Sequence, residues 1–348
     1  MTPLYFRSFV LSACALLIFF FLAATPHSNI VRQSTSTFAK TREWIRNDQR
    51  ERLAYATFLT GTQANLDNIT ATESTLRDDK YFTAARLLGY HLMHKPATRT
   101  RINIPFIVMV TSSVPTVEVD RLRKDGAIIV VVDSQPTGEW FHPNTARWND
   151  VMTKLRLWQL ENYDRVVFLD VDSALTGSLD GVFDDAGAKL VSTVPNPQSP
   201  LDVETESAIP EMFLMASAPE TKRHHEFPPI RKDYIHGPDY FNAGFFIFSP
   251  SHMLHAHYTS LTSNITTPKF KTGCPEQNLL NYAHRRNGPM PWTNLDPKWN
   301  IILANKNDVE KGAVSMHLKW WEAKGLSQWF DREIAEMEGY YFAMDERE

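Results

Sequence analysis

The chain has 348 residues, 43% of them hydrophobic and 22% charged, a balance typical of a folded globular protein rather than a disordered or fibrous one. Its 36 Lys and Arg stand against 40 Asp and Glu, so no overall positive field exists to hold DNA or RNA, and we expect no nucleic-acid partner. The two cysteines, Cys14 and Cys274, are too few for a disulfide framework or a zinc finger.

The N-terminal segment predicts a membrane anchor. Residues 8–24 are largely apolar and carry no charge, with Arg7 before them and Thr25-Pro26 after them. As a helix rising about 1.5 Å per residue, this segment would cross a thin bilayer. A cleaved secretory signal peptide is the alternative. We therefore expect a cytoplasmic tail at 1–7 and a transmembrane signal anchor at 8–24.

Two glycosylation sequons favour a lumenal location for the remainder. Asn68-Ile69-Thr70 and Asn264-Ile265-Thr266 have no proline at the middle position. Residues 25–50 are polar, with few apolar side chains to bury, and are typical of a stem. The short span fits the Golgi, so the prediction is a single-pass type II Golgi membrane protein with a lumenal catalytic part.

From residue 51 onward, short apolar runs alternate with helix-like segments. They cover residues 54–59, 84–92, 105–110, 127–132, 151–160 and 166–169. The run 128–132 is Ile-Ile-Val-Val-Val, without polar alternation, and this predicts a strand buried on both faces, as in parallel sheets covered by helices. The pattern indicates an α/β fold.

The pattern changes between residues 195 and 240. Eight prolines fall in this stretch, which excludes long regular structure, and we interpret residues 194–240 as an insertion. A second apolar run follows at 241–248, and a short amphipathic helix is predicted at 277–284. Residues 322–348 read as a charged, helix-prone tail without assigned chemistry.

Two acids directly follow the apolar strand at 166–169. They are Asp170 and Asp172, separated by Val171. In open α/β sheets ligands bind beyond the carboxyl ends of strands, where two such oxygen ligands could hold Mg²⁺ or Mn²⁺ against a diphosphate. The plain alternative is a strand end followed by a helix cap.

The surrounding residues carry a family resemblance. Thr153-Lys154-Leu155 stands upstream of the two acids, and Ser178-Leu179-Asp180-Gly181-Val182-Phe183-Asp184 stands downstream. This block resembles the donor-binding core of glycosyltransferase family eight, the glycogenin-like and galactinol-synthase-like enzymes, with its T-K-L, D-x-D and I-D-x-L-F-D segments. The resemblance covers roughly residues 51–321.

Further segments resemble the same family in the same order. Residues 54–60 resemble its first strand, which receives uridine, and Tyr81 opens the next helix. Residues 240–250 are similar to F-N-x-G-x-x-x-x-x-P. Residues 275–281 are similar to D-Q-x-L-L-N, with Glu276 in place of the usual Asp, and residues 295–300 match L-x-x-x-[YW]-N.

One segment departs from the family pattern. The family has H-F-x-G-x-x-K-P-W, in which the His is a third metal ligand and the Lys binds diphosphate, whereas here Met316-His317-Leu318-Lys319-Trp320-Trp321 lacks the Gly. His317 fits the ligand position. Lys319 lies closer to the His than the family lysine does, and Lys324 competes with it for the diphosphate role.

The resemblance implies a GT-A fold, with a mixed, mostly parallel sheet flanked by helices, and transfer of a hexose from a UDP-sugar to a glycan or glycoprotein acceptor. The implied ligands of Mn²⁺, or of Mg²⁺, are Asp170, Asp172 and His317. The implied donor-binding residues are Leu59, Thr60, Tyr81, Lys154, Asp170, Val171, Gly244 and Lys319. The implied catalytic residues are Asn242, Glu276 and Gln277. The family retains anomeric configuration, and the sequence leaves open double displacement or front-face substitution.

The sequence also leaves two other classes of function open. A catalytically silent lumenal scaffold or lectin-like binder is suggested by the altered His317 segment. A metal-dependent phosphodiesterase could use the same acids but usually needs a second metal. The pairs His224-His225 and His255-x-His257 lack an accompanying ligand cluster, so we expect them to be solvated loop histidines rather than zinc ligands.

Overall fold

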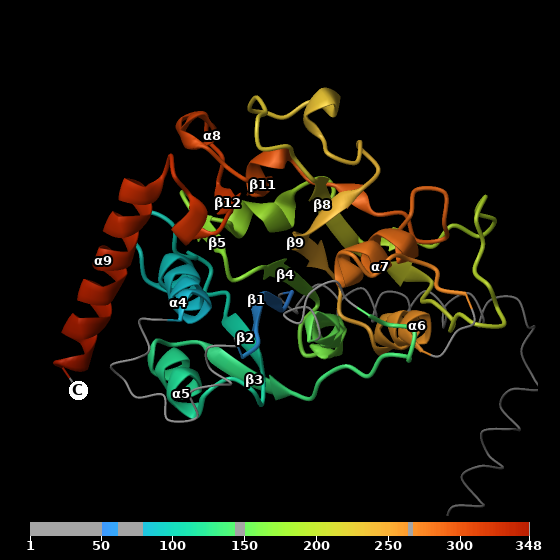
Figure 1. The fold of residues 1–348 in the computed structure, drawn as a ribbon, viewed down its shortest axis with the longest axis horizontal. Coiled ribbons are helices and arrows are strands. Elements are labelled where there is room, and N and C mark those ends of the chain that lie inside the picture. Colours follow the sequence, from blue (N-terminus) through green and yellow to red (C-terminus); the bar gives the residue numbers. More distant parts are fainter. Residues whose placement is uncertain (1–50, 62–78, 143–149, 264–266, 348) are drawn as a thin grey trace, which may run out of the picture. The chain divides into compact units, whose positions relative to one another are not determined.

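The computed structural model of the chain describes residues 51–61, 79–142, 150–263 and 267–347 (Figure 1). The predicted tail, anchor and stem, and the sequon residues Asn68 and Asn264, lie outside these ranges. No helix within them is both long and apolar enough to cross a membrane. Residues from Arg52 onward form one compact unit.

A seven-stranded sheet is the centre of this unit, in the order β10-β8-β9-β4-β1-β2-β3. Neighbouring strands pair in parallel, except that β9 runs antiparallel to both β4 and β8. This confirms the predicted α/β class with a mixed, mostly parallel sheet. The strands are β1 Leu53–Leu59, β2 Phe106–Thr111, β3 Ile128–Val132, β4 Arg165–Leu169, β8 Met215–Pro219, β9 Phe241–Phe248 and β10 Thr293–Asn294.

Two smaller sheets flank the central one. A three-stranded sheet joins β11 (Ile301–Ile302), β12 (Ser315–His317) and β5 (Ser173–Leu175), and a two-stranded ribbon pairs β6 (Val191–Ser192) with β7 (Met212–Phe213). The three-stranded sheet matters for function because β5 begins directly after Asp172.

Helices cover both faces of the central sheet. The α-helices are α4 Lys80–Met93, α5 Thr116–Lys124, α6 His252–Thr262, α7 Pro275–Ala283, α8 Lys306–Glu310 and α9 Ser327–Asp345. The 3-10 helices are η3 Val151–Gln159, η4 Asp180–Asp184, η5 Arg231–Asp233, η6 Pro297–Trp299 and η7 Trp320–Glu322. α4 and α5 pack on the face that carries Tyr55, while η3, α6 and α7 pack on the face that carries Ala56.

The expectation that the run 128–132 is buried on both faces is wrong. β3 is the last strand of the sheet, and Ile128 and Val131 are 46% and 59% exposed. The buried strands are those inside the sheet, β1, β2, β4, β8 and β9. Composition alone cannot separate an edge strand from a central one, because both are rich in β-branched residues.

The interpretation of residues 194–240 as an insertion also needs correction. Part of this segment is β8, a buried strand that lies between β10 and β9 in the central sheet. Its proline, Pro219, is at the strand end, where a missing N–H does little harm. The part that lies outside the sheet is therefore shorter than the sequence indicated.

The C-terminal tail contains α9, which packs against α4 through a buried polar cluster. His91 of α4 is fully buried, and its Nδ1 accepts the backbone N–H of Leu175 at 3.1 Å. Its Nε2 therefore carries the proton and donates to Glu333 of α9, 3.0 Å away. Burial lowers the pKa of His91, in agreement with a neutral ring. The tail is thus tied to β5, next to the Asp170-Val171-Asp172 turn.

We expect His91→Leu to lower the free energy of unfolding by about 3 kcal/mol, because it leaves the Leu175 N–H and the Glu333 carboxylate without this partner. Urea denaturation would measure the loss. His252→Leu is the matched control, since His252 pairs with Glu161 at an exposed position and should stay close to wild type. Equal stability of the two variants would contradict the structural role of His91.

Candidate active site

The candidate site lies at one edge of the central sheet. The carboxyl ends of β1, β4 and β8 meet there because these strands run in the same direction, and antiparallel β9 begins there. This is the edge at which open α/β sheets bind ligands. The residues that follow or begin these strands include Thr60, Asp170, Glu220 and Asn242.

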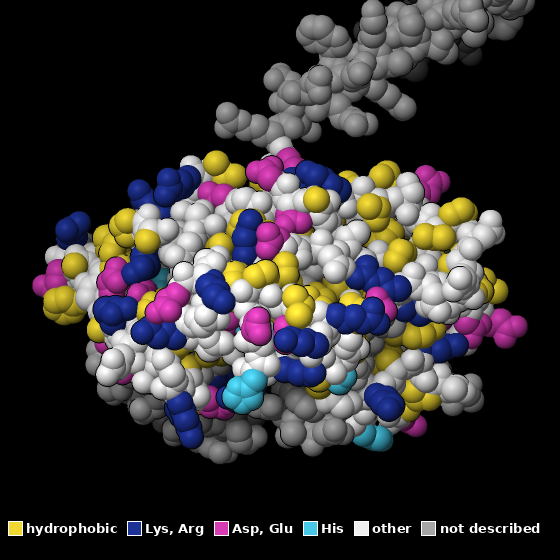
Figure 2. Space-filling view, turned by 90° about the horizontal axis from the view of Figure 1, so that it is seen from above, with side chains coloured by type: hydrophobic (Ala, Val, Ile, Leu, Met, Phe, Trp, Pro, Cys, Tyr) yellow, Lys and Arg dark blue, Asp and Glu magenta, His cyan; other side chains and the backbone are white. Residues whose placement is uncertain are grey.

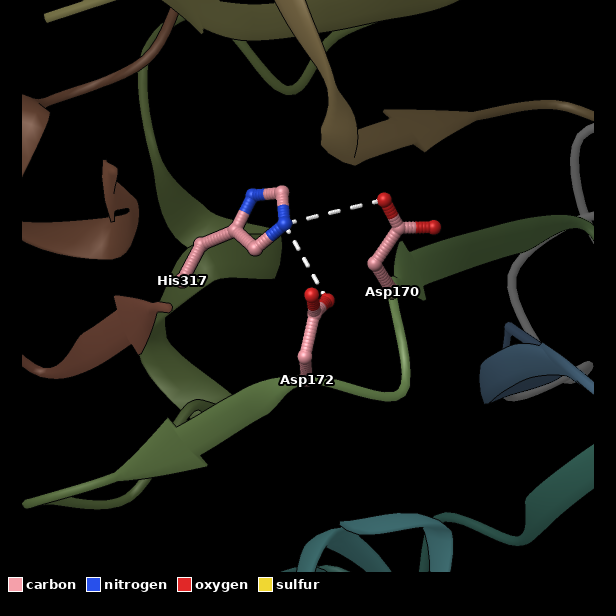
Figure 3. Close-up of side chains that lie close together, drawn as sticks. All are labelled: Asp170, Asp172 and His317. Atoms are coloured by element: carbon pink, nitrogen blue, oxygen red, sulfur yellow. Dashed lines mark ion pairs between the residues drawn. The ribbon is translucent and has the colours of Figure 1, made fainter. Parts of the chain in front are cut away.

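Three potential ligand side chains meet at this edge, as Figure 3 shows. His317 Nε2 lies 3.2 Å from Asp172 Oδ1 and 3.7 Å from Asp170 Oδ2, and one ligand atom from each residue falls within 4.8 Å of the others. The β5–β12 register places His317 opposite Ser173, directly after Asp172. Strand pairing therefore unites residues that are far apart in the sequence.

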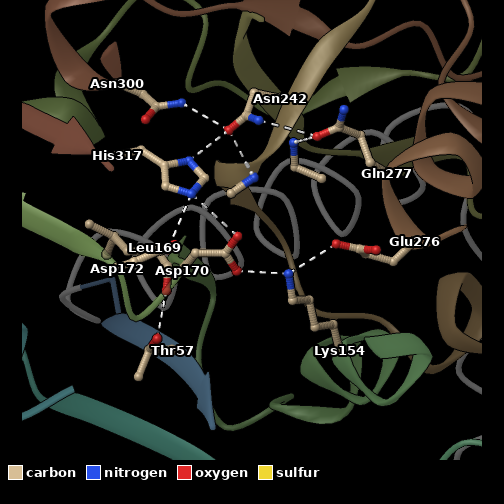
Figure 4. A network of polar contacts seen from close by, with 12 residues as sticks. Thr57, Lys154, Leu169, Asp170, Asp172, Asn242, Glu276, Gln277, Asn300 and His317 are labelled. Atoms are coloured by element: carbon tan, nitrogen blue, oxygen red, sulfur yellow. Dashed lines mark hydrogen bonds and ion pairs between the residues drawn. The ribbon is translucent and has the colours of Figure 1, made fainter. Parts of the chain in front are cut away.

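The orientation of the His317 ring is fixed by Asn242 (Figure 4). Asn242 Oδ1 accepts the backbone N–H of Gly244 at 3.1 Å, which identifies this atom as the oxygen, and it lies 3.1 Å from His317 Nδ1. Nδ1 therefore carries a proton and donates it to Asn242. Nε2 is then the nitrogen that faces both carboxylates.

Gly244 lets β9 approach this cluster. A Cβ at this position would lie 2.9 Å from Asp170 Oδ2 and closer still to His317 Cε1 and Nδ1. The backbone of β9 also accepts the Asp170 N–H through the Gly244 carbonyl at 2.8 Å. Glycine is required here for space.

The charges of the cluster shift its pKa values in opposite directions. Burial opposes a charged ring, but the charge of Asp172, its hydrogen bond and the charge of Asp170 outweigh it and raise the pKa of His317. Burial likewise opposes ionisation of Asp172, yet His317, Lys319 and Lys154 lower its pKa. Asp172 is only 13% exposed and paired, so it is not a solvated strand-end acid.

These residues fit a divalent cation. Two carboxylates and an imidazole nitrogen form a ligand set that several divalent metal ions accept. The hydrogen bond at Nδ1 presents Nε2 in the way expected of a ligating histidine. The His317 ring occupies the space that a Cβ at Gly244 would take, so the glycine is what lets this ligand reach the two carboxylates.

Lys154 and Glu276 extend the site on its other side. Lys154 Nζ lies 2.7 Å from Asp170 Oδ1 and 3.0 Å from Glu276 Oε1. Burial opposes the ammonium charge, but the two carboxylates outweigh it and raise the pKa of Lys154. Lys154 therefore stays charged and bridges the end of β4 to the start of α7.

Gln277 is the centre of a second network, which includes two residues that sequence reasoning missed. Its Oε1 accepts hydrogen bonds from the Ala243 N–H and from Asn242 Nδ2. Its Nε2 donates to Glu220 Oε2 and to the Tyr240 hydroxyl, and both of these bonds are 3.2 Å long. Burial raises the pKa of Glu220. Glu220 had no motif to mark it, because it sits in the Pro-rich stretch.

The remaining predicted donor residues are placed differently. Leu59 and Val171 are buried in the core, so only their backbone groups are left to contact a ligand. The hydroxyl of Thr60 joins a polar cluster at the ends of β1 and β2, 3.2 Å from Asp150 Oδ2. The ring of Tyr81 packs edge-on against Trp321, and Lys319 is near enough to Asp172 to lower its pKa.

The histidines expected to be solvated do not behave alike. His224 is exposed, whereas the His225 side chain is fully buried and His257 is buried as well. His225 Nδ1 donates to the Lys222 carbonyl at 2.6 Å, and Nε2 donates to Asp308 Oδ2 at 3.1 Å. His225 therefore links the segment after β8 to α8. The interpretation as solvated loop histidines is wrong for His225 and for His257, which is buried on helix α6.

Known proteins were found that resemble this chain in sequence or in fold. Residues 74–319 match the model of the family described as glycosyl transferase family 8. An uncharacterized protein of Schizosaccharomyces pombe is 28% identical over 71% of this chain and 70% of its own length, and galactinol synthase 7 of Arabidopsis thaliana is 24% identical over 79% and 83%. Mouse xyloside xylosyltransferase 1 aligns with a TM-score of 0.46 and 13% identity over 76% of this chain and 97% of that structure.

The His225 pair predicts a pH-dependent stability. The hydrogen bond to Asp308 raises the pKa of His225, and the Lys222 carbonyl adds to this effect while burial opposes it. The pair therefore stabilises the fold fully below about pH 6.5, and this stabilisation is lost as the pH rises through the raised pKa. We expect His225→Gln to lower the free energy of unfolding more at about pH 5.5 than at about pH 8.5. Urea titrations with His224→Gln as control check this, and an equal loss at both pH values would contradict it.

Gly244→Ala should displace His317 from the cluster, because the added methyl group meets the ring and Asp170 Oδ2. We expect Mn²⁺ affinity, measured by isothermal titration, to fall by tenfold or more. Gly339→Ala in α9 is the control, since nothing lies near its added Cβ and the change should slightly stabilise the helix. Wild-type Mn²⁺ affinity in Gly244→Ala would show that His317 is not a ligand.

Proposed function

The chain belongs to glycosyl transferase family 8 and is therefore a glycosyltransferase. We propose that it moves a hexose from a UDP-sugar to a glycan or glycoconjugate acceptor with retention of anomeric configuration. The observation that carries the proposal is the meeting of Asp170, Asp172 and His317 Nε2 at the carboxyl edge of the sheet. That edge is where a nucleotide diphosphate would present its charge.

We propose that these three residues hold Mn²⁺, or Mg²⁺ in its place. The ion would supply positive charge against the diphosphate of the leaving UDP. Asn242 fixes the ligating nitrogen of His317, and Lys154 balances the charge of Asp170 from the side away from His317. Lys319, whose charge lowers the pKa of Asp172, would contact the same diphosphate.

The hexose would lie against Asn242, Glu276 and Gln277. Both acceptor positions of Gln277 Oε1 are used by Asn242 and Ala243, which makes this amide a poor nucleophile. Glu276 is held by Lys154 at 3.0 Å. These contacts support front-face substitution, in which an oxygen of the leaving diphosphate takes the acceptor proton, over a covalent intermediate.

We propose a lumenal Golgi location for the reaction, with a type II membrane anchor at residues 8–24. The support is the uncharged apolar segment and the two sequons at Asn68 and Asn264. All of these lie outside the described residues.

A screen of UDP-glucose, UDP-galactose and UDP-N-acetylglucosamine with the full chain tests the activity. We expect Mn²⁺-dependent release of UDP from one of the three and none in the presence of a chelator. A catalytically silent binder would release no UDP, and a phosphodiesterase would instead release UMP. Titration of UDP with and without Mn²⁺ separates the silent binder further, because metal-linked UDP binding is expected of the transferase.

Asp172→Asn should lower the transfer rate by about a hundredfold, or about 3 kcal/mol of transition-state stabilisation, because one metal ligand loses its charge. A modest fall in melting temperature is expected as well, since the variant weakens the pair with His317. Asp331→Asn, at an exposed position of α9, is the control and should change neither quantity. Full activity of Asp172→Asn with an unchanged Mn²⁺ requirement would refute the metal site.

A further inference from the structure

The segment that joins β8 to β9, residues 220–240, stands beside the candidate site for a topological reason. β8 ends and β9 begins at the carboxyl edge of the sheet, so both ends of the segment, here named the β8–β9 loop, lie at that edge. In Figure 1 this yellow segment extends outward beyond β8 and β9. Anything bound on the loop would therefore lie at the entrance to the site.

The loop is held in place by hydrogen bonds along its length. Thr221 and Tyr234 form a β-bridge, and the N–H groups of Lys222 and Ile235 donate to the carbonyls of Asp233 and Glu220 at 2.8 and 2.9 Å. Thr221 Oγ1 donates to the carbonyl of Ile302, which pairs in register with His317. The loop is thus a fixed arm joined to the metal-ligand strands.

The base of the loop reaches the candidate catalytic residues. Glu220 and Tyr240, its first and last residues, both accept hydrogen bonds from Gln277 Nε2. His236 Nε2 lies 3.7 Å from Glu220 Oε2. An acceptor that rests on the loop could therefore place a hydroxyl group near the hexose.

Exposed cations outnumber exposed acids on the loop, although residues 220–240 hold as many Asp and Glu as Lys and Arg. Its exposed cations are Lys222, Arg223, Arg231 and Lys232. Its two exposed acids are occupied, because Glu226 faces Lys232 at 3.7 Å and Asp239 faces Arg286 at 3.5 Å. Arg223 and Arg231 have no ion pair with any residue that the structure describes.

The face of the molecule on which the loop lies is shown in Figure 2, where Lys, Arg and His side chains gather in the lower middle of the view. Two exposed apolar side chains, Ile230 and Ile235, belong to the same loop and are 52% and 43% exposed. A surface with unpaired guanidinium groups beside apolar side chains suits a ligand that combines anionic groups with the apolar faces of sugar rings.

We propose that the β8–β9 loop is the acceptor platform and that the acceptor is an anionic glycan, whose phosphate or carboxylate groups bind Arg223 and Arg231. This inference rests on the proposed glycosyltransferase function and adds the chemical class of the acceptor. The guanidinium groups bind the anionic part, while Glu220 and Tyr240 lie where the receiving hydroxyl enters.

Binding measurements on the full chain test the inference independently of catalysis. The probes are a neutral oligomannoside, the same oligomannoside bearing a phosphate monoester, a uronic-acid oligosaccharide, UDP, and vesicles containing phosphatidylserine. The variant is Arg223→Glu with Arg231→Glu. The control is Arg99→Glu, an exposed arginine in the connection from α4 to β2, which lies at the amino edge of the sheet, away from the site.

We expect at least one anionic oligosaccharide to bind tenfold or more tightly than the neutral one, and the double variant to lose that preference while Arg99→Glu keeps it. Preference for the phosphate or for the uronate form identifies the anionic group. Equal binding of neutral and anionic glycans overturns the inference. So does an equal loss in Arg99→Glu, arginine-dependent binding to vesicles alone, or an equal loss of UDP affinity in the double variant.

Release of UDP from a UDP-sugar by the wild-type chain separates a failure of the inferred acceptor class from a failure of the proposed function. If UDP is released but glycan binding shows no dependence on the two arginines, the inference on the acceptor fails and the proposed function stands. If the arginines bind anionic glycans but no UDP-sugar is turned over, the proposed transferase function fails and the anion-binding surface stands.

Discussion

The hydrogen bond between His317 Nδ1 and Asn242 Oδ1 is the interaction on which the candidate site depends. It decides that Nε2 is the nitrogen facing Asp170 and Asp172. Asn242 can accept it because the Gly244 N–H has already fixed which of its side-chain atoms is the oxygen. Gly244 in turn leaves space for the ring. One strand, β9, thus supplies the orientation, the acceptor and the space.

This arrangement concentrates charged side chains at a place where they add little to the stability of the fold. Asp170, Asp172 and Glu276 lie mostly out of solvent, and they are tolerated because His317 and Lys154 stand within ion-pair distance. A core of the same size built from apolar residues would be at least as stable. Local choices that disagree with stability are expected at functional sites, and here the conflict is confined to the edge where parallel strands end.

The sequence predicted those site residues that their neighbours in the chain mark. Asp170 and Asp172 follow an apolar strand, and His317 and Asn242 lie in short sequence motifs, so their roles could be predicted before their contacts were known. Glu220, His225 and the edge position of β3 could not be read this way. Their environments are set by residues distant in sequence, such as Gln277, Asp308 and the absence of a strand beyond β3 in the seven-stranded order.

The donor and acceptor sides of the proposed enzyme differ in how far their side chains are held by other residues. Donor-side residues are bound to the sheet and to one another, so a change in one disturbs several, as Asn242 shows with its contacts to His317, Gly244 and Gln277. Arg223 and Arg231 on the β8–β9 loop have no ion pair with any described residue, while the base of the loop is held at Glu220 and Tyr240. Side chains at its tip can therefore change without moving the catalytic groups. A fixed arm with a free outer surface allows one donor site to serve different acceptors.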